Sequence, residues 1–164
     1  SSRGNGSSIL SISNSEISNN RSNGYPGGTL KIEQVTTPFS ATLINTTISG
    51  NSTQYRGGGI DSDSDYLTII NSTIINNTAD SGGGGVWLQS DSRIVNTIIS
   101  GNQGLSPVDV YLDRNPNVFA ENSIFGSGSV TASGSLGAFV PDSTNILASS
   151  DRENFALDAI LDTT

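Results

Sequence analysis

The sequence contains no cysteine, no histidine and no methionine, and charged residues make up only 13% of it. Without cysteine the fold cannot be cross-linked by disulfide bonds, and no thiolate can bind a metal. Without histidine the chain lacks the side chain that most often moves protons near neutral pH. Catalysis or metal binding would therefore depend on carboxylates, hydroxyls, lysine and arginine.

Long apolar runs are also missing, because no segment approaches the ~18 residues needed to cross a bilayer. Fifteen acidic residues against seven basic ones give a formal net charge of −8. This balance disfavours nucleic acid and anionic membranes as partners and leaves cations or neutral sugars as easier ones. No signal peptide opens the sequence. Since the chain starts at Ser1 rather than at methionine, we expect a processed or excised piece of a longer protein.

What the sequence does contain is a repeat. The segment INSTIINNT at 70–78 has counterparts at 12–20, 44–51, 95–102 and 121–128. A period of about 25 residues is typical of repeat architectures. Apolar residues stand two positions before and three positions after the first asparagine of each copy, so each repeat supplies its own buried contacts. Aligning the copies predicts a structural ladder of five asparagines, namely Asn14, Asn45, Asn71, Asn96 and Asn122.

Each repeat reads as strand, asparagine turn, strand, polar loop, glycine turn and strand. The density of Asn, Ser, Thr and Gly opposes helix formation. Three short strands in ~25 residues predict an all-β fold, a single-stranded parallel β-helix of about five to six coils. In such a solenoid, equivalent asparagines of neighbouring coils stack and hydrogen-bond along the axis.

We predict one β-helix domain over 1–164, with regular coils over 9–128 and an irregular terminal coil and tail over 129–164. Asn145 is predicted to be the last rung. The strand edges of the first coil would be left unpaired. A preceding domain or another copy of the chain is therefore expected to dock there, and end-to-end assembly into filaments is an expectation of the same kind.

The repeats resemble those of bacterial surface proteins. Residues 74–77, 48–51 and 99–102 look like the FxxN repeat of the polymorphic outer membrane proteins, with Ile in place of Phe, and 58–60 and 84–86 look like its GGA[ILV] partner. Long bacterial surface proteins that repeat NSTISGN followed by GGGI are more similar still. The resemblance implies a right-handed β-helix in an extracellular or cell-surface bacterial protein. It brings no catalytic residues.

The sharpest candidate for a binding site is the stretch GGGIDSDSDY at 57–66. If Ile60 points inward, strand alternation turns the three aspartates after it outward together. The same register places Trp87 beside Asp61 one coil along, with Lys31 on the other side. The predicted ligand-binding residues are Asp61, Asp63, Asp65, Trp87 and Asp91.

Two interpretations of this cluster stay open. An exposed tryptophan among carboxylates could stack on a sugar ring while the acids bind its hydroxyls or hold Ca²⁺. Alternatively, the acids only keep a sheet face soluble and Trp87 packs under a loop. The string of aspartates is not an EF-hand, because Tyr66 stands where that loop requires glycine.

We therefore expect a structural or adhesive module that presents a repetitive acidic, hydroxyl-rich surface to glycans, cations, neighbouring domains or other copies of itself. It is predicted not to be an enzyme, with no catalytic residue and no resident cofactor. The alternative is a polysaccharide-binding or polysaccharide-cleaving β-helix of the lyase or hydrolase type. Asp61 and Asp63 would stand ~6.5 Å apart from strand rise alone, which suits a glycosidase, and Lys31 or Arg93 could serve a lyase as base.

Overall fold

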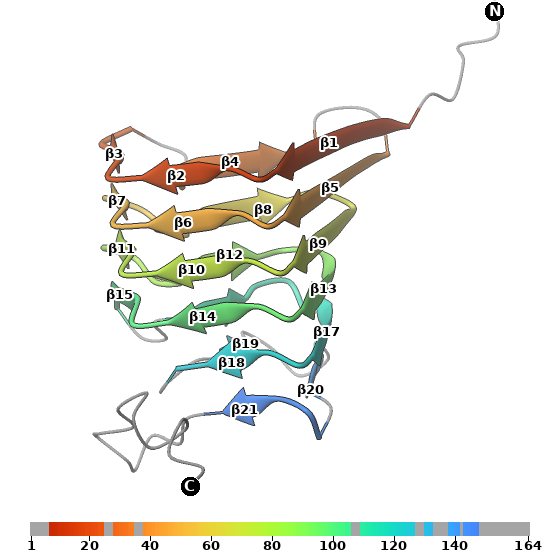
Figure 1. The fold of residues 1–164 in the computed structure, drawn as a ribbon. Helices are drawn as coiled ribbons and strands as arrows, with labels where there is room; N and C mark the ends of the chain where they lie inside the picture. Colours follow the sequence, from red (N-terminus) through yellow and green to blue (C-terminus); the bar gives the residue numbers. More distant parts are fainter. Residues whose placement is uncertain are drawn as a thin grey trace, which may run out of the picture.

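A computed structural model of the chain describes residues 7–24, 28–34, 38–105, 109–126, 130–132, 138–141 and 143–147. Figure 1 shows them as short strands stacked in layers along one axis. Helices are absent from the described residues. That part of the chain accordingly holds no helix long and apolar enough to cross a membrane.

The described strands form four sheets, and all neighbouring strands in them run parallel. In sheet order, the first sheet contains β1 (Ser8–Ser13), β5 (Phe39–Ile44), β9 (Tyr66–Ile70), β13 (Asp91–Val95), β17 (Asn117–Glu121) and β20 (Ala138–Pro141). The second contains β2 (Glu16–Ser18), β6 (Thr47–Ser49), β10 (Thr73–Ile75), β14 (Ile98–Ser100), β18 (Ile124–Phe125) and β21 (Ile146–Leu147).

The third sheet contains β3 (Arg21–Ser22), β7 (Ser52–Thr53), β11 (Thr78–Ala79) and β15 (Gln103–Gly104). The fourth contains β4 (Leu30–Glu33), β8 (Ile60–Asp63), β12 (Val86–Leu88), β16 (Val110–Leu112) and β19 (Val130–Ala132). One coil is one circuit of the chain through these sheets. The prediction of an all-β parallel solenoid is thus confirmed.

The core is a column of aliphatic side chains inside the sheets. Ile48, Ile74 and Ile99 are register partners in three neighbouring strands and are each 0% exposed. Phe125 follows them in β18 and packs edge-on against Phe139. Because each inward position stacks on its equivalents above and below, a short repeat with few apolar residues still builds a continuous core.

The asparagine column predicted from the sequence lies at the turns between the first and second sheets. Its five members have φ between 48° and 51°, a left-handed conformation that asparagine tolerates better than most residues. All five are exposed. Asn45 Nδ2 donates to Asn14 Oδ1, and Asn96 Nδ2 donates to Asn71 Oδ1, both over 3.1 Å. The column therefore sets the turns, and it forms a hydrogen-bonded ladder in these two pairs.

A second column of asparagines forms a continuous and buried ladder at the turns between the second and third sheets. Asn51, Asn77 and Asn102 are each at most 4% exposed. The backbone and side-chain amides of Asn51 both donate to Asn77 Oδ1, and those of Asn77 both donate to Asn102 Oδ1, over 2.9–3.0 Å. The Asn77 Nδ2 atom also donates to the carbonyl of Ile48, one coil back. We call Asn20, Asn51, Asn77, Asn102 and Asp109 the inner ladder.

Asp109 ends the inner ladder from a position that the two preceding coils give to glycine. The strand register aligns Asp109 with Gly85 and Gly59. Its Oδ1 accepts from the backbone and side-chain amides of Asn102, over 2.9 and 2.7 Å. A Cβ on Gly85 would lie 2.7 Å from Asn102 Nδ2 and 2.5 Å from the carbonyl oxygen of Asp109. The glycine column of the sequence therefore reflects how closely the backbone passes the ladder.

A third column consists of the hydroxyl residues that follow the exposed asparagines. Thr46, Ser72, Thr97 and Ser123 are buried. Each donates its hydroxyl to the carbonyl two residues earlier, and three of these hydroxyls accept from the backbone N–H of the preceding coil, over 3.1–3.3 Å.

Asn145 continues this column, because its Oδ1 accepts from the Ser123 N–H. It is a rung as predicted, but one residue off the predicted column. Most of the predicted terminal coil and tail over 129–164 lies outside the described residues.

Replacing one rung of the inner ladder should destabilise the whole stack. Asn77→Ala leaves the Asn51 amides and the Ile48 carbonyl without their Asn77 partner and removes one of the two donors to Asn102 Oδ1, since the backbone N–H of residue 77 remains. We expect a loss of about 2–5 kcal/mol in unfolding free energy. Chemical denaturation checks this value. Asn71→Gly, which keeps the left-handed turn at an exposed position, should change stability by less than about 1 kcal/mol. Equal losses for the two variants would contradict the distinction between the columns.

The glycine beside the ladder should not accept a methyl group. We expect Gly85→Ala to cost about 1–3 kcal/mol, because its Cβ would overlap the Asp109 carbonyl and the Asn102 amide. Gly24→Ala is the matched control, since no heavy atom lies within 4 Å of a Cβ there. Thermal melts of the two variants decide the prediction, which fails if Gly85→Ala melts with the parent chain.

Candidate functional site

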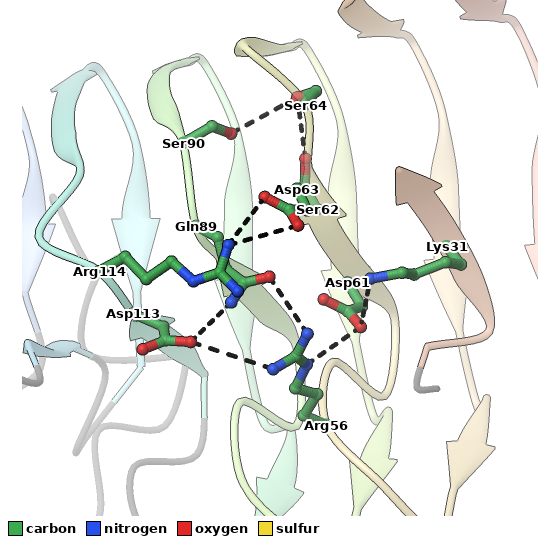
Figure 2. A network of polar contacts seen from close by, with 10 residues as sticks. All are labelled: Lys31, Arg56, Asp61, Ser62, Asp63, Ser64, Gln89, Ser90, Asp113 and Arg114. Atoms are coloured by element: carbon green, nitrogen blue, oxygen red, sulfur yellow. Dashed lines mark hydrogen bonds and ion pairs between the residues drawn. The ribbon is translucent and has the colours of Figure 1, made fainter. Parts of the chain in front are cut away.

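Of the predicted cluster, Asp61, Asp63 and Trp87 lie in strands of the fourth sheet, whereas Asp65 precedes β9 and Asp91 begins β13, both of the first sheet. The register aligns Lys31, Asp61, Trp87 and Tyr111 in one row across β4, β8, β12 and β16. The predicted neighbours of Asp61, with Lys31 on one side and Trp87 on the other, are therefore confirmed. Figure 2 shows the polar contacts that surround this row.

Asp61 is enclosed, although it sits on the outer side of its strand. Its exposed fraction is 0%. Lys31 Nζ lies 3.0 Å and Arg56 Nε 3.2 Å from Oδ2, while Oδ1 is buried without a hydrogen-bond partner. A Cβ on Gly28 would come within 2.8 Å of the Asp61 Cβ, so backbone packs over the carboxylate as well. The expectation that Asp61 presents its carboxylate to a ligand in solvent is wrong, because two cations and a glycine cover it.

The ion pair continues into the next coils as a network. Arg56 Nη2 donates to Gln89 Oε1 over 3.1 Å, and Gln89 Nε2 donates to Asp113 Oδ2 over 2.7 Å. Arg56 Nη1 also lies 3.9 Å from Asp113 Oδ2. Figure 2 shows Arg56 between Asp61 and Asp113, with Gln89 bridging. Together with Lys31, these side chains link all four strands from β4 to β16, so their charges hold neighbouring coils together.

Trp87 is covered on both faces of its ring. It stacks on Tyr111 with ring centroids 3.9 Å apart and an interplanar angle of 17°. The Arg56 guanidinium carbon lies 5.1 Å from the Trp87 ring centroid, within range of a cation–π interaction. Tyr111 belongs to the coil after Trp87 and Arg56 to the coil before it. A sugar ring therefore finds no free face of the indole on which to stack.

The other predicted acids serve separate local contacts. Asp63 pairs with Arg114 at 3.4 Å, in a pair whose side chains are 35% and 62% exposed. Asp65 accepts from the backbone N–H of Phe39. Asp91 accepts from the backbone N–H of Asn117 over 2.8 Å. Asp65 and Asp91 thus tie neighbouring strands, whereas the Asp63 pair spans two coils, from β8 to the segment after β16. The three acids do not converge on one ligand.

The described residues of this region include no group of three metal-binding acids and no serine that contacts a base. Among the described residues, no three acidic side chains gather where they could hold a metal ion. The Ca²⁺ considered from the sequence would therefore find no cluster of three carboxylates among the described residues. Ser62, Ser64 and Ser90 lie close together, but their hydroxyls contact one another and not a base.

Several residues of the network escaped the sequence analysis. Tyr111 could have been found by aligning Val110 and Leu112 with the strand around Trp87, because the inward residues match. Arg56 and Gln89 occur once each at their positions and repeat in no other coil, so no periodic signal marks them. Their role depends on how the coils pack.

A shallow groove follows the third sheet. One hollow, of about 200 Å³, is lined by Arg21, Ser22, Ser52, Thr53, Gln54, Thr78 and Asp80. A second, of about 460 Å³, is lined by Thr78, Ala79, Asp80, Gln103, Gly104 and Leu105. Among the described residues, Asp80 is the one acid that lines either hollow. The groove thus offers hydroxyls and amides along the axis but not the pair of carboxylates that a glycosidase needs.

Removing the enclosed charge should cost far more than removing the exposed one. We expect Asp61→Asn to lower the unfolding free energy by about 3 kcal/mol, because Lys31 and Arg56 lose their shared partner. Asp63→Asn should cost less than about 1 kcal/mol, since its pair with Arg114 is exposed. Urea denaturation of both variants at one salt concentration tests the contrast. A loss no larger for Asp61→Asn than for Asp63→Asn would show that the network does not stabilise the coils.

Comparisons of the chain with protein-family models, with curated proteins and with solved structures give no match. The resemblance to bacterial surface repeats therefore stays a prediction. What this chain does has to be argued from its own side chains.

Proposed function

We propose that this chain is a structural module of an extracellular or cell-surface bacterial protein. In this proposal the solenoid is a right-handed β-helix of five to six coils. It holds its outer faces at fixed spacing for weak, multivalent contact with glycans or neighbouring subunits. The likeness of the repeats to NSTISGN and GGGI surface proteins supports this assignment.

The observation that carries the proposal is that the reactive side chains of the fourth sheet make contacts between coils. Asp61, Arg56 and Trp87 would be the first choices for chemistry on the fourth sheet, and all three are engaged in contacts between coils. Asp65 and Asp91 cap backbone N–H groups of neighbouring strands. Groups that stabilise the stack in this way are not free to bind and release a substrate.

The outer faces differ from coil to coil. In the first sheet, Thr42, Thr68, Arg93 and Phe119 are register partners in one outward row. Such a row repeats at the strand spacing of about 4.8 Å. Its mixture of hydroxyl, cation and aromatic does not make the uniform threonine face of a stacking or ice-binding surface. It fits contacts with a chemically varied partner surface.

The alternative is a polysaccharide-binding β-helix, and the groove along the third sheet is the observation that favours it. Its hydroxyls and amides match sugar hydroxyls in hydrogen-bonding type, and Arg21 and Asp80 stand among them. A ligand in this groove would not touch Trp87, which packs against the fourth sheet. The two functions can therefore be separated by substitution.

A glycan array decides between these functions. We expect Trp87→Ala to leave the glycan profile of the full chain unchanged while lowering its melting temperature, because the indole serves packing. Asp61→Asn is the control for destabilisation alone. A glycan lost in Trp87→Ala but retained in Asp61→Asn would contradict the structural proposal. A glycan that the full chain binds and Asp80→Ala loses would favour the alternative.

A further inference from the structure

The N-terminal end of the solenoid is an open sheet end. β1, β2, β3 and β4 are each the terminal strand of their sheet, paired on one side only with β5, β6, β7 and β8. Figure 1 shows these four strands as the outermost layer at the N-terminal end. Among the described residues, no strand pairs with their outer edges. Backbone groups on such edges are a template for another strand.

The apolar core is uncovered at the same end. Leu10, Ile12, Ile17 and Leu30 point into the solenoid but are only partly buried. Their register partners in the next coil, Ala41, Leu43, Ile48 and Ile60, are at most 1% exposed. The difference arises because the second coil has neighbours on both sides and the first has one. A further coil would bury the first layer as fully as the others.

The inner ladder adds a directional signal. In each inner step, an asparagine Oδ1 accepts two amides from the coil before it, as Asn51 Oδ1 does from the backbone and side chain of Asn20. Asn20 donates to Asn51 in the same way, but no described residue donates to Asn20 Oδ1. The unused hydrogen-bonding atom at this end is therefore an acceptor, Asn20 Oδ1. An asparagine on an added coil could donate to it.

The described residues toward the C-terminal end do not supply that donor. The ladder stops at Asp109, whose carboxylate accepts from Asn102 and has no amide to pass on. In the described part of the chain, the third sheet also ends there, with β15 as its last strand. The described residues of a second copy stacked head to tail would thus offer no strand for β3 and no asparagine donor for Asn20.

We infer that the N-terminal end is an interaction surface for a parallel β-solenoid coil from another polypeptide segment. That coil carries an asparagine in register with Asn20, donates its backbone and side-chain amides to Asn20 Oδ1, and covers the four open apolar side chains. The inference goes beyond the proposed function. It holds whether or not the outer faces bind glycans.

A graft of one extra coil tests the inference on the full chain. Residues 39–64, inserted between Ser7 and Ser8, continue the observed register, because Ser8 aligns with Phe39 and Ser40 aligns with Tyr66. The inserted copy of Asn51 then stands over Asn20. We expect amide exchange in β1, β2 and β4 to slow by at least about tenfold and the melting temperature to rise by about 4 °C or more.

The matched control is the same graft with Asn51→Ala in the inserted copy only. It should lose most of the gain, and a double-mutant cycle with Asn20→Ala should show that the two residues are coupled. The covalent link keeps the inserted coil at millimolar effective concentration. An inserted coil that stays unprotected in hydrogen exchange, or protects equally with alanine, would overturn the inference.

The choice of partner is tested on the chain without a graft. Light scattering over a hundredfold concentration range should report one monomeric mass. Oligomers that grow with concentration and disappear when the grafted coil caps the N-terminal end would show that a second copy is the occupant, which overturns the choice of another segment.

Discussion

The fold depends on satisfying backbone polar groups at its bends. A solenoid of two- to six-residue strands bends several times per coil, and each bend takes N–H and C=O groups out of the strand pairing. The inner ladder meets this need at the turn between the second and third sheets, because each buried asparagine accepts two amides and donates to a carbonyl one coil back. At the preceding turn, the hydroxyls of Ser72, Thr97 and Ser123 each accept one backbone N–H from the coil before and donate to the carbonyl two residues earlier. With the bends satisfied, a thin aliphatic core suffices.

Much of this architecture could be predicted from the sequence, because equivalent residues of a solenoid have the same environment in every coil. The period, the inward isoleucines and the exposed turn asparagines all recur, and the alignment of Asp61 with Trp87 and Lys31 followed from strand alternation. The choice of ladder was harder. Asn45 and Asn51 belong to the same repeat and recur with the same period, so periodicity alone does not reveal that the first is exposed and the second buried.

The candidate site was less predictable because it depends on residues that do not repeat. Strand alternation turned Asp61 outward, but it carried no information about Arg56, which reaches over from the preceding loop and closes off the carboxylate. The same guanidinium lies against Trp87 and converts a ring that looked available for a sugar into a packed one. Outward direction on a sheet and exposure to solvent are different properties, and long side chains such as arginine decide between them.

Asp109 ends the inner ladder, while the first, second and fourth sheets continue beyond it. Between Asn20 and Asp109 every rung of the inner ladder is chemically equivalent, so a whole coil can be duplicated or deleted in the gene while both ends keep their hydrogen-bonding character. The number of rungs at this turn can therefore differ without a change in the chemistry at the two ends of the ladder. A carboxylate in place of one glycine marks where such growth ends.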